Sequence, residues 1–452
     1  MSDLRAGRDK RTARGFSKIS GVAAALLAVA APLSFSVPAQ AQWSAPQPAF
    51  GQDLQEFYAA RRGAPLWFEN GQPSEAAGAL LELLNSAETD GLNPDSYRLR
   101  DVAMAVRAAW GGRPQEVSRA DYLLSQAFVE YARDIRRAGN SGVIYVDNEL
   151  RPAPPSPRAI LEDAARADSL ADYVSNLGWM NPAYAKLRNA LALGNYSGDA
   201  ERRRLQLNLE RSRELPAGRG RYVLVNAAAQ QLDMIEDGEV VGSMKVVVGK
   251  TKNPTPMMAA YIRFAALNPY WNVPPDLAAE RIAPNVVKDG LGYLKTHGYE
   301  VLSDWGENPS IVDPLTIDWK AVADGSVEIR VRQLPGPGNS MGQMKFMFPN
   351  EQGIYLHDTP DKELLTEASR LFSGGCVRLE DAPRLGEWLF GRPLVTEGAG
   401  TEQPAPLPKP VPVYITYMTA MPSGSSIAYF DDIYGRDIAR SASLSAGLAN
   451  SR

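Results

Sequence analysis

The first half of the chain has the hydrophobic spacing of α-helices. Between positions 54 and 193, apolar residues recur three and four positions apart, as at Leu80, Leu81 and Leu84. This spacing places them on one face of a helix with 3.6 residues per turn. We therefore expect a helix-rich first domain over residues 42–200.

Two segments interrupt or end this pattern. Four prolines within 142–158 are incompatible with a continuous helix and predict an extended excursion. The stretch 201–214 carries arginines and glutamates around Leu205 and Leu209. It predicts a solvated connecting helix over residues 201–220, in preference to a phosphate-binding patch.

Beyond Arg221 the apolar residues alternate, which is the pattern of β-strands. Tyr222–Val225 predicts the first strand. The segment 231–248 predicts a hairpin that turns at Asp237-Gly238, a dipeptide suited to the positive φ angles of a type I′ turn. Further strands are expected at 264–267, 327–333, 344–348 and 354–357.

The β-rich half predicts a second domain over residues 221–395, so the expected fold class is α+β. Residues 276–326 mix helical and loop signals and predict an insertion, and with the Gly- and Pro-rich segment 335–342 the inserted lobe is expected over 276–342. Alternating prolines at 404–412 predict a stiff extended connector before a strand at 413–418. We expect residues 396–452 to form this connector, the strand and a tail.

Composition excludes several classes of function. The 48 Lys and Arg residues against 52 Asp and Glu give a net charge of −4, which provides no overall basic field to hold nucleic acid. A single cysteine, Cys376, and two histidines, His297 and His357, exclude a disulfide framework and a cysteine-rich zinc site. We expect no metal and no other cofactor.

Residues 1–41 have the features of an export signal. Basic residues precede the apolar run 22–31, and Ala39-Gln40-Ala41 supplies the small residues that a signal peptidase recognises. The apolar run is shorter than the roughly 20 residues that span a bilayer, which disfavours an uncleaved anchor. We expect cleavage after Ala41 and no stable transmembrane segment.

The single cysteine lies in the sequence Ser373-Gly374-Gly375-Cys376-Val377-Arg378. Two glycines before a thiol allow a sharp turn that brings bare N–H groups near the sulfur, as an oxyanion hole requires. A lone cysteine is also often a small buried apolar residue. An unpaired thiol in an exported chain meets oxidants, however, which favours a functional role.

His357 ends a predicted strand 19 positions before Cys376. Pairing with an imidazole is the usual way to make a thiolate near neutral pH. The segment 361–372 predicts a helix or helical loop that could return Cys376 to the sheet beside His357. The alternative is a structural histidine at a strand end. His297, which has no Cys or His neighbour, is interpreted as structural.

Arg378 follows the thiol by two positions and has two interpretations. Its guanidinium could lower the pKa of the thiol or bind a substrate carboxylate through two parallel hydrogen bonds. The alternative is a structural ion pair with Glu380 or Asp381.

These motifs resemble the signature of the L,D-transpeptidases, whose catalytic domain is called YkuD. The branch most similar is the large periplasmic one that has an N-terminal scaffold domain. The resemblance rests on His357-Asp358-Thr359-Pro360 and Ser373–Arg378, and it extends to 208–211, 268–275, 413–417 and 432–437. It implies a periplasmic location and a capping lobe at 276–342.

The resemblance implies a cysteine acyltransferase that acts on peptidoglycan tetrapeptide stems as donor and acceptor. Cys376 would attack the carbonyl before the terminal D-alanine, expel D-alanine and form a thioester. His357, oriented by the carbonyl of Asp358, would accept the thiol proton and then deprotonate an acceptor amine, which gives a 3→3 cross-link. The N–H groups of Gly375 and Cys376 would hold the oxyanion.

The same resemblance assigns the substrate pocket and an inhibitor class. The residues expected to shape the donor site are Tyr355, Arg378, Ser373, Gly374 and Trp271. Carbapenems would acylate Cys376.

The chain departs from the family pattern at two places. Position 374 is Gly where relatives often carry Ser or His, and the short segment 194–200 leaves no room for the peptidoglycan-binding module usual in this branch. An L,D-carboxypeptidase that uses water as acceptor and an inactive wall-binding scaffold remain alternatives. A papain-like peptidase is disfavoured because its Cys precedes its His.

Overall fold

The structure is a computed structural model that describes residues 50–137, 139, 141–218, 220–306, 308–396 and 401–441. The expected export signal, its cleavage position after Ala41 and the end of the tail lie outside these residues. Within the described ranges, no helix combines the length and the apolar character that crossing a membrane requires.

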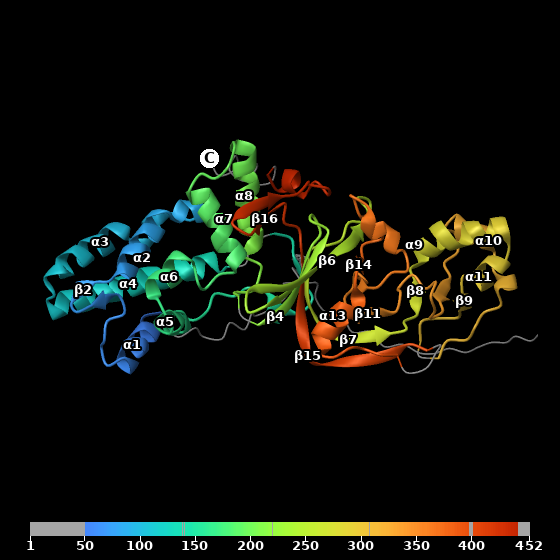
Figure 1. Ribbon diagram of the computed structural model, residues 1–452, viewed down its shortest axis with the longest axis horizontal. Helices are drawn as coiled ribbons and strands as arrows, with labels where there is room; N and C mark the ends of the chain where they lie inside the picture. The colour runs from blue at the N-terminus through green and yellow to red at the C-terminus, as the bar shows by residue number, and fades with distance from the viewer. Residues whose placement is uncertain are drawn as a thin grey trace, which may run out of the picture. The chain divides into compact units, whose positions relative to one another are not determined.

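The first half is helical, as its hydrophobic spacing predicts (Figure 1). Its longest helix, α4 (Pro114–Ile135), buries residues on successive turns, and its Phe128 packs edge-to-face between Trp67 and Trp179. The other helices of this half are α1 (Phe50–Ala60), α2 (Glu75–Asn85), α3 (Leu99–Ala108), α5 (Pro157–Ala165), α6 (Leu170–Ser175), α7 (Pro182–Ala192) and α8 (Asp199–Ser212). A two-stranded hairpin, β1 (Phe68–Glu69) and β2 (Gln72–Pro73), lies between α1 and α2.

The proline-rich interruption is extended, as predicted, and it also joins the sheet of the second half. Its strand β3 (Ile144–Tyr145) pairs in parallel with β7 (Met258–Leu267). Helix α5 then begins at Pro157, where a proline costs no hydrogen bond, and Ser156 caps it by accepting the N–H of Ala159 at 3.1 Å.

The prediction that α8 is a solvated helix is wrong for one of its faces. Leu205 and Leu209, one turn apart, pack into the core of the helical half. Asn208 and Arg211 are buried as well. The high charge of this segment made the buried face hard to predict, although every charged residue of α8 except Arg211 is at least partly exposed.

The second half is built on a 10-stranded sheet with the order β11-β12-β14-β6-β5-β4-β15-β7-β3, with β13 paired to β6. Strand β11 also pairs with β7, so the sheet closes on itself. The predicted hairpin is present, and Asp237 and Gly238 both have positive φ at its turn. The remaining bounds are β4 (Arg221–Asn226), β5 (Gln231–Glu236), β6 (Glu239–Gly249), β11 (Met344–Met347), β12 (Leu356–His357), β13 (Leu371–Ser373) and β14 (Val377–Leu379).

The inserted lobe has a hydrophobic core and a sheet of its own. The sheet has the order β8-β10-β9, formed by Trp271–Val273, Arg330–Gln333 and Tyr299–Leu302. It therefore includes residues that precede position 276, where the insertion was predicted to start. Helical segments complete the lobe: α9 (Pro275–Leu277), the π-helical turn η5 (Ala278–Ile282), α10 (Ala283–Asp289), α11 (Gly292–Thr296) and α12 (Trp319–Ala323).

The proline-rich run near the C-terminus is a strand of the main sheet and not a connector. Strand β15 (Gln403–Thr416) pairs with β7 along most of its length, whereas β4 joins its other edge only from Val413. An edge without a strand partner tolerates prolines, because no N–H is required there. Helix α13 (Ala382–Phe390) precedes β15, and the hairpin β16 (Ala420–Ser423) and β17 (Ser426–Tyr429) follows it.

Candidate active site

Two neighbouring parallel strands bring His357 and Cys376 to the same part of the sheet. His357 ends β12, and Cys376 immediately precedes β14; in the register of these strands His357 lies opposite Arg378. The chain between them forms a 3₁₀ helix at Lys362–Thr366 and strand β13, so the crossover is only partly helical. A parallel pair requires such a crossover.

One pocket of about 240 Å³ is lined by both residues. The side chain of Trp271 and the expected substrate residues Tyr355, Ser373, Gly374 and Arg378 line it as well. The other two predicted site residues, Asp358 and Gly375, do not line the pocket, but their backbone groups hydrogen-bond to the lining residues His357 and Ser373. The predicted constellation is thus collected around a single cavity.

The imidazole of His357 is buried and held in one orientation. Its Nδ1 lies 2.5 Å from the carbonyl oxygen of Asp358, so Nδ1 carries the proton and Nε2 is left as the basic nitrogen. Burial and, to a smaller extent, the nearby positive charge of Arg378 together lower the pKa of His357 to about 3. The ring is therefore neutral at physiological pH.

The loop before β11 fixes Asp358 in turn. The Asp358 carboxylate accepts the N–H of Gln343 at 2.9 Å and pairs with Lys362 at 2.7 Å. Gly342 has φ +62°, and a Cβ at this position would lie 2.3 Å from the carboxylate. Only glycine allows the loop to pass this close to Asp358.

The thiol of Cys376 is neutral in this structure. It donates to the carbonyl of Gly353 at 3.5 Å, and no hydrogen bond joins the two described side chains of Cys376 and His357. Burial raises the pKa of Cys376 to about 11, against the opposing effects of the Tyr355 N–H and the Arg378 charge. The expectation of a thiolate at neutral pH does not hold for the resting site, because burial disfavours the charged form of both groups.

The glycine turn before the thiol is internally hydrogen-bonded. Gly375 has φ +124°, and its N–H donates to Ser373 Oγ at 3.1 Å. The same hydroxyl donates to the carbonyl of Cys376 at 2.6 Å. The N–H of Cys376 has no partner among the described residues, so of the two expected oxyanion donors only this one is available.

Arg378 forms an ion pair, but with a different residue from those expected. Its Nη1 lies 3.1 Å from Asp361 Oδ2, whereas Glu380 accepts the N–H of Lys245 and Asp381 caps α13. Its Nε is buried without a partner among the described residues. Burial lowers the pKa of Arg378.

Sequence models of two families match the chain. That of the L,D-transpeptidase catalytic domain, the YkuD family, matches residues 220–413, and that of the Scaffold domain matches residues 52–191. The chain carries an L,D-transpeptidase catalytic domain. One relative is a Haemophilus influenzae protein that is named as an L,D-transpeptidase by inference. It is 28% identical to this chain over 395 residues, and the match covers 85% of this chain and 78% of the relative. These matches confirm the resemblance that the motifs indicated.

Solved structures of lower similarity include two mycobacterial proteins. An L,D-transpeptidase from Mycobacterium smegmatis is 15% identical, with a TM-score of 0.22, over 44% of this chain and 60% of the solved one. Mycobacterium tuberculosis L,D-transpeptidase 1 is 13% identical, with a TM-score of 0.18, over 44% and 64%. The match spans less than two thirds of either solved chain.

The pocket also contains residues that sequence reasoning missed. The lobe contributes Asp276, Leu277, Arg281 and Met341 to the pocket, and the loop after β6 contributes Asn253. None of them lies in a recognisable motif. The one feature of the sequence that pointed to the lobe residues was the predicted capping lobe over 276–342. His297 is outside the pocket, where its ring lies tilted against that of Tyr293, with 4.2 Å between the ring centroids.

Proposed function

We propose that this protein is a peptidoglycan L,D-transpeptidase that forms 3→3 cross-links through a thioester on Cys376. The observation that carries the proposal is that Cys376 and His357 line one pocket of an L,D-transpeptidase catalytic domain, with Nε2 of His357 left unprotonated. The substrate is a tetrapeptide stem, which an exported enzyme would meet in the periplasm.

The first half-reaction starts from the neutral pair. The thiol leaves the carbonyl of Gly353 and turns toward His357, and its proton passes to Nε2 as the sulfur attacks the donor carbonyl. A carbon–sulfur bond forms, the carbon–nitrogen bond to D-alanine breaks, and the leaving amine takes the proton from His357. Because burial keeps the pKa of His357 low, the imidazolium returns this proton readily.

The second half-reaction uses the same base. His357, neutral again, deprotonates the side-chain amine of an acceptor stem, which attacks the thioester. The carbon–sulfur bond breaks, the new amide forms, and the thiol recovers its proton. Water in place of the amine would give the trimmed tripeptide of an L,D-carboxypeptidase.

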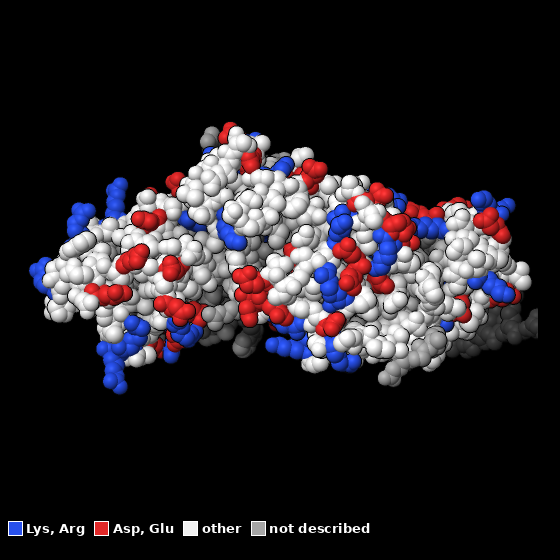
Figure 2. Space-filling view, viewed as in Figure 1, with Lys and Arg blue, Asp and Glu red and all other residues white. Residues whose placement is uncertain are grey.

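Two guanidinium groups suit a substrate that contains carboxylates. Arg378 and Arg281 line the pocket, and no ion pair of Arg281 is present among the described residues. Elsewhere on the surface the charges are mixed: Figure 2 shows basic and acidic residues interspersed over the visible face. Inside the pocket the two guanidinium groups outnumber the one carboxylate among the lining residues, that of Asp276, which favours recognition of carboxylates there over attraction of a polyanion to the surface.

Incubation of the purified protein with tetrapeptide muropeptides tests the proposal. Cross-linked dimers and free D-alanine are expected; tripeptides alone would indicate a carboxypeptidase, and unchanged substrate would indicate an inactive scaffold. Mass spectrometry after meropenem tests the nucleophile. An adduct is expected on the natural sequence and none on Cys376→Ser, and an adduct on that variant would contradict the assignment.

A further inference from the structure

A second buried hydroxyl, besides that of Ser373, holds the turn that carries Cys376. Thr255 is fully buried, and its Oγ1 donates to the carbonyl of Gly375 at 2.8 Å. The same oxygen accepts the N–H of Gly249 at 2.9 Å. The hydroxyl proton of Thr255 is therefore committed to the peptide unit that leads into the nucleophile.

This hydrogen bond sets the direction of the N–H beside the thiol. The carbonyl of Gly375 and the N–H of Cys376 belong to one planar peptide unit, and in its trans form they point in opposite directions. When Thr255 holds the carbonyl, the Cys376 N–H must point away from Thr255. This is the N–H without a partner, since that of Gly375 is bound to Ser373.

We propose that Thr255 is a positioning residue, which directs the Cys376 N–H at the oxyanion that forms when the sulfur attacks a carbonyl. The inference rests on the proposed function only in that Cys376 must be an acylated nucleophile. It requires no particular acceptor and no peptidoglycan substrate.

The backbone around Thr255 is itself fixed by the C-terminal motif 432–437. Arg436 donates to the carbonyl of Thr255 at 2.8 Å, and the Tyr434 hydroxyl donates to the carbonyl of Gly249 at 2.7 Å. The loop after Gly249 folds tightly over it, since a Cβ there would lie 2.1 Å from the carbonyl oxygen of Asn253. Thr255 thus has little freedom to move with respect to the nucleophile turn.

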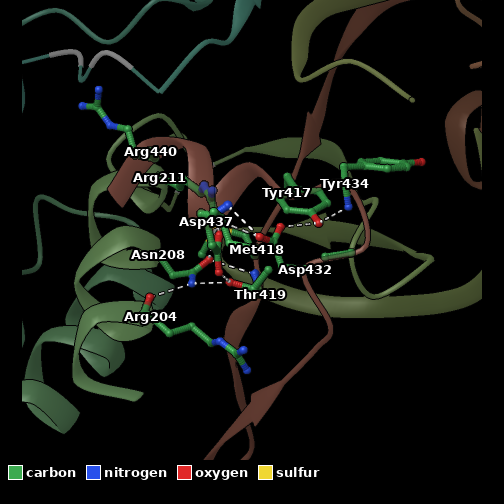
Figure 3. Close-up of polar contacts among 12 residues, drawn as sticks. Arg204, Asn208, Arg211, Tyr417, Met418, Thr419, Asp432, Tyr434, Asp437 and Arg440 are labelled. Carbon is green, nitrogen blue, oxygen red and sulfur yellow. Dashed lines mark hydrogen bonds and ion pairs between the residues drawn. The ribbon is translucent and has the colours of Figure 1, made fainter. Parts of the chain in front are cut away.

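The C-terminal motif is held by a partly buried polar cluster (Figure 3). Tyr417 donates to Asp432 at 2.8 Å and accepts the N–H of Tyr434 at 2.9 Å. At the other end of the motif Asp437 pairs with Arg211 of α8 at 2.6 Å. Through these contacts the C-terminal motif supports the loop that carries Thr255. The proposed function by itself assigns this motif no role.

An activated ester tests the positioning role without a peptidoglycan substrate. With p-nitrophenyl acetate, a bond forms between the sulfur and the acetyl carbon, the bond to p-nitrophenolate breaks, and the thiol proton passes to His357. In the tetrahedral intermediate between these two steps the former carbonyl oxygen carries a negative charge. Alkylation by iodoacetamide needs the same sulfur but forms no oxyanion. The comparison of the two rates therefore isolates oxyanion stabilisation.

Thr255→Val keeps the shape of the side chain and removes both hydrogen bonds of the hydroxyl. We expect its Cys376-dependent acylation rate, measured against Cys376→Ala, to fall about 10²-fold while its alkylation rate stays unchanged. Thr255→Ser, which restores the hydroxyl, should remain within about threefold of the natural sequence. Thr416→Val, at a buried threonine that makes no hydrogen bond to the turn, is the matched control.

Three results would overturn the inference. These are unchanged acylation in Thr255→Val, a parallel fall in acylation and alkylation, and a loss in Thr255→Ser as large as that in Thr255→Val. Absence of a Cys376-dependent burst in the natural sequence would overturn it too. If the natural sequence is acylated by the ester but leaves muropeptides unchanged, the proposed function fails while the test of Thr255 stands.

Discussion

At the scale of single residues, the site is governed by the effect of burial on two titrating groups. Burial raises the pKa of Cys376 to about 11 and lowers that of His357 to about 3, so the resting pair is neutral between these values. A raised thiol pKa means that thiolate accumulates only as the pH approaches it. Attack at neutral pH must then be coupled to proton transfer.

This pair of pKa values predicts how the free thiol reacts. The rate of alkylation by iodoacetamide should rise about tenfold per pH unit between pH 7 and 10, because thiolate is the reactive form. Mass spectrometric labelling of Cys376 across this range measures the rate. A plateau that is already reached below pH 7 would mean a preformed ion pair with His357 and would contradict the neutral pair.

Gly342 should be required for the orientation of His357. In Gly342→Ala the new Cβ would overlap the carboxylate of Asp358, whose carbonyl holds the ring, and φ is positive at this position. We expect a loss of more than about 2 kcal/mol in the free energy of unfolding, together with a lower kcat. Urea denaturation and turnover assays measure the two effects. Gly338→Ala is the control, because it lies in the same loop with nothing within 4 Å of the new Cβ, and it should change neither the free energy of unfolding nor kcat.

At the scale of elements, the lobe brings charge to the pocket through an unusual turn. Arg281 lies in the π-helical turn η5, a conformation that is frequent at functional sites. Arg281→Met should raise KM for a tetrapeptide donor about tenfold and leave kcat nearly unchanged, since a charge-assisted contact to a carboxylate would be lost in ground and transition state alike. Arg330→Met, in β10 of the same lobe but outside the pocket, is the control; equal KM values for the two variants would exclude this role.

Sequence reasoning succeeded for elements whose signal is local. The helical spacing of the first half and the Asp237-Gly238 turn depend on neighbours within a few residues, and each is present. The pairing of β3 with β7 could not be predicted, because it joins segments more than 100 positions apart. The burial that determines the pKa of Cys376 and the entry of Arg281 into the pocket depend on such distant packing as well.

At the scale of the whole molecule, a buried ion pair connects the helical half to the C-terminal motif. Arg211 and Asp437 are 7% and 12% exposed, and each would remain as an uncompensated charge without the other. Arg211→Leu should therefore lower the free energy of unfolding by about 3–5 kcal/mol in urea titrations. Arg166→Leu removes an exposed pair with Asp163 and should cost less than about 1 kcal/mol. Equal losses would show that burial does not decide the effect.

The two halves should unfold in a single transition, because each contributes to the structure of the other. Strand β3 leaves the helical half to extend the main sheet, while Met418 and Ala420 return from that sheet to the core of the helices. Calorimetry should then give one peak, with a calorimetric enthalpy equal to the van't Hoff enthalpy. Two peaks, or a calorimetric enthalpy well above the van't Hoff value, would mean that the helical half folds independently. In that case the ion pair of Arg211 with Asp437 would not couple the folding of the helical half to the C-terminal motif that supports the nucleophile turn.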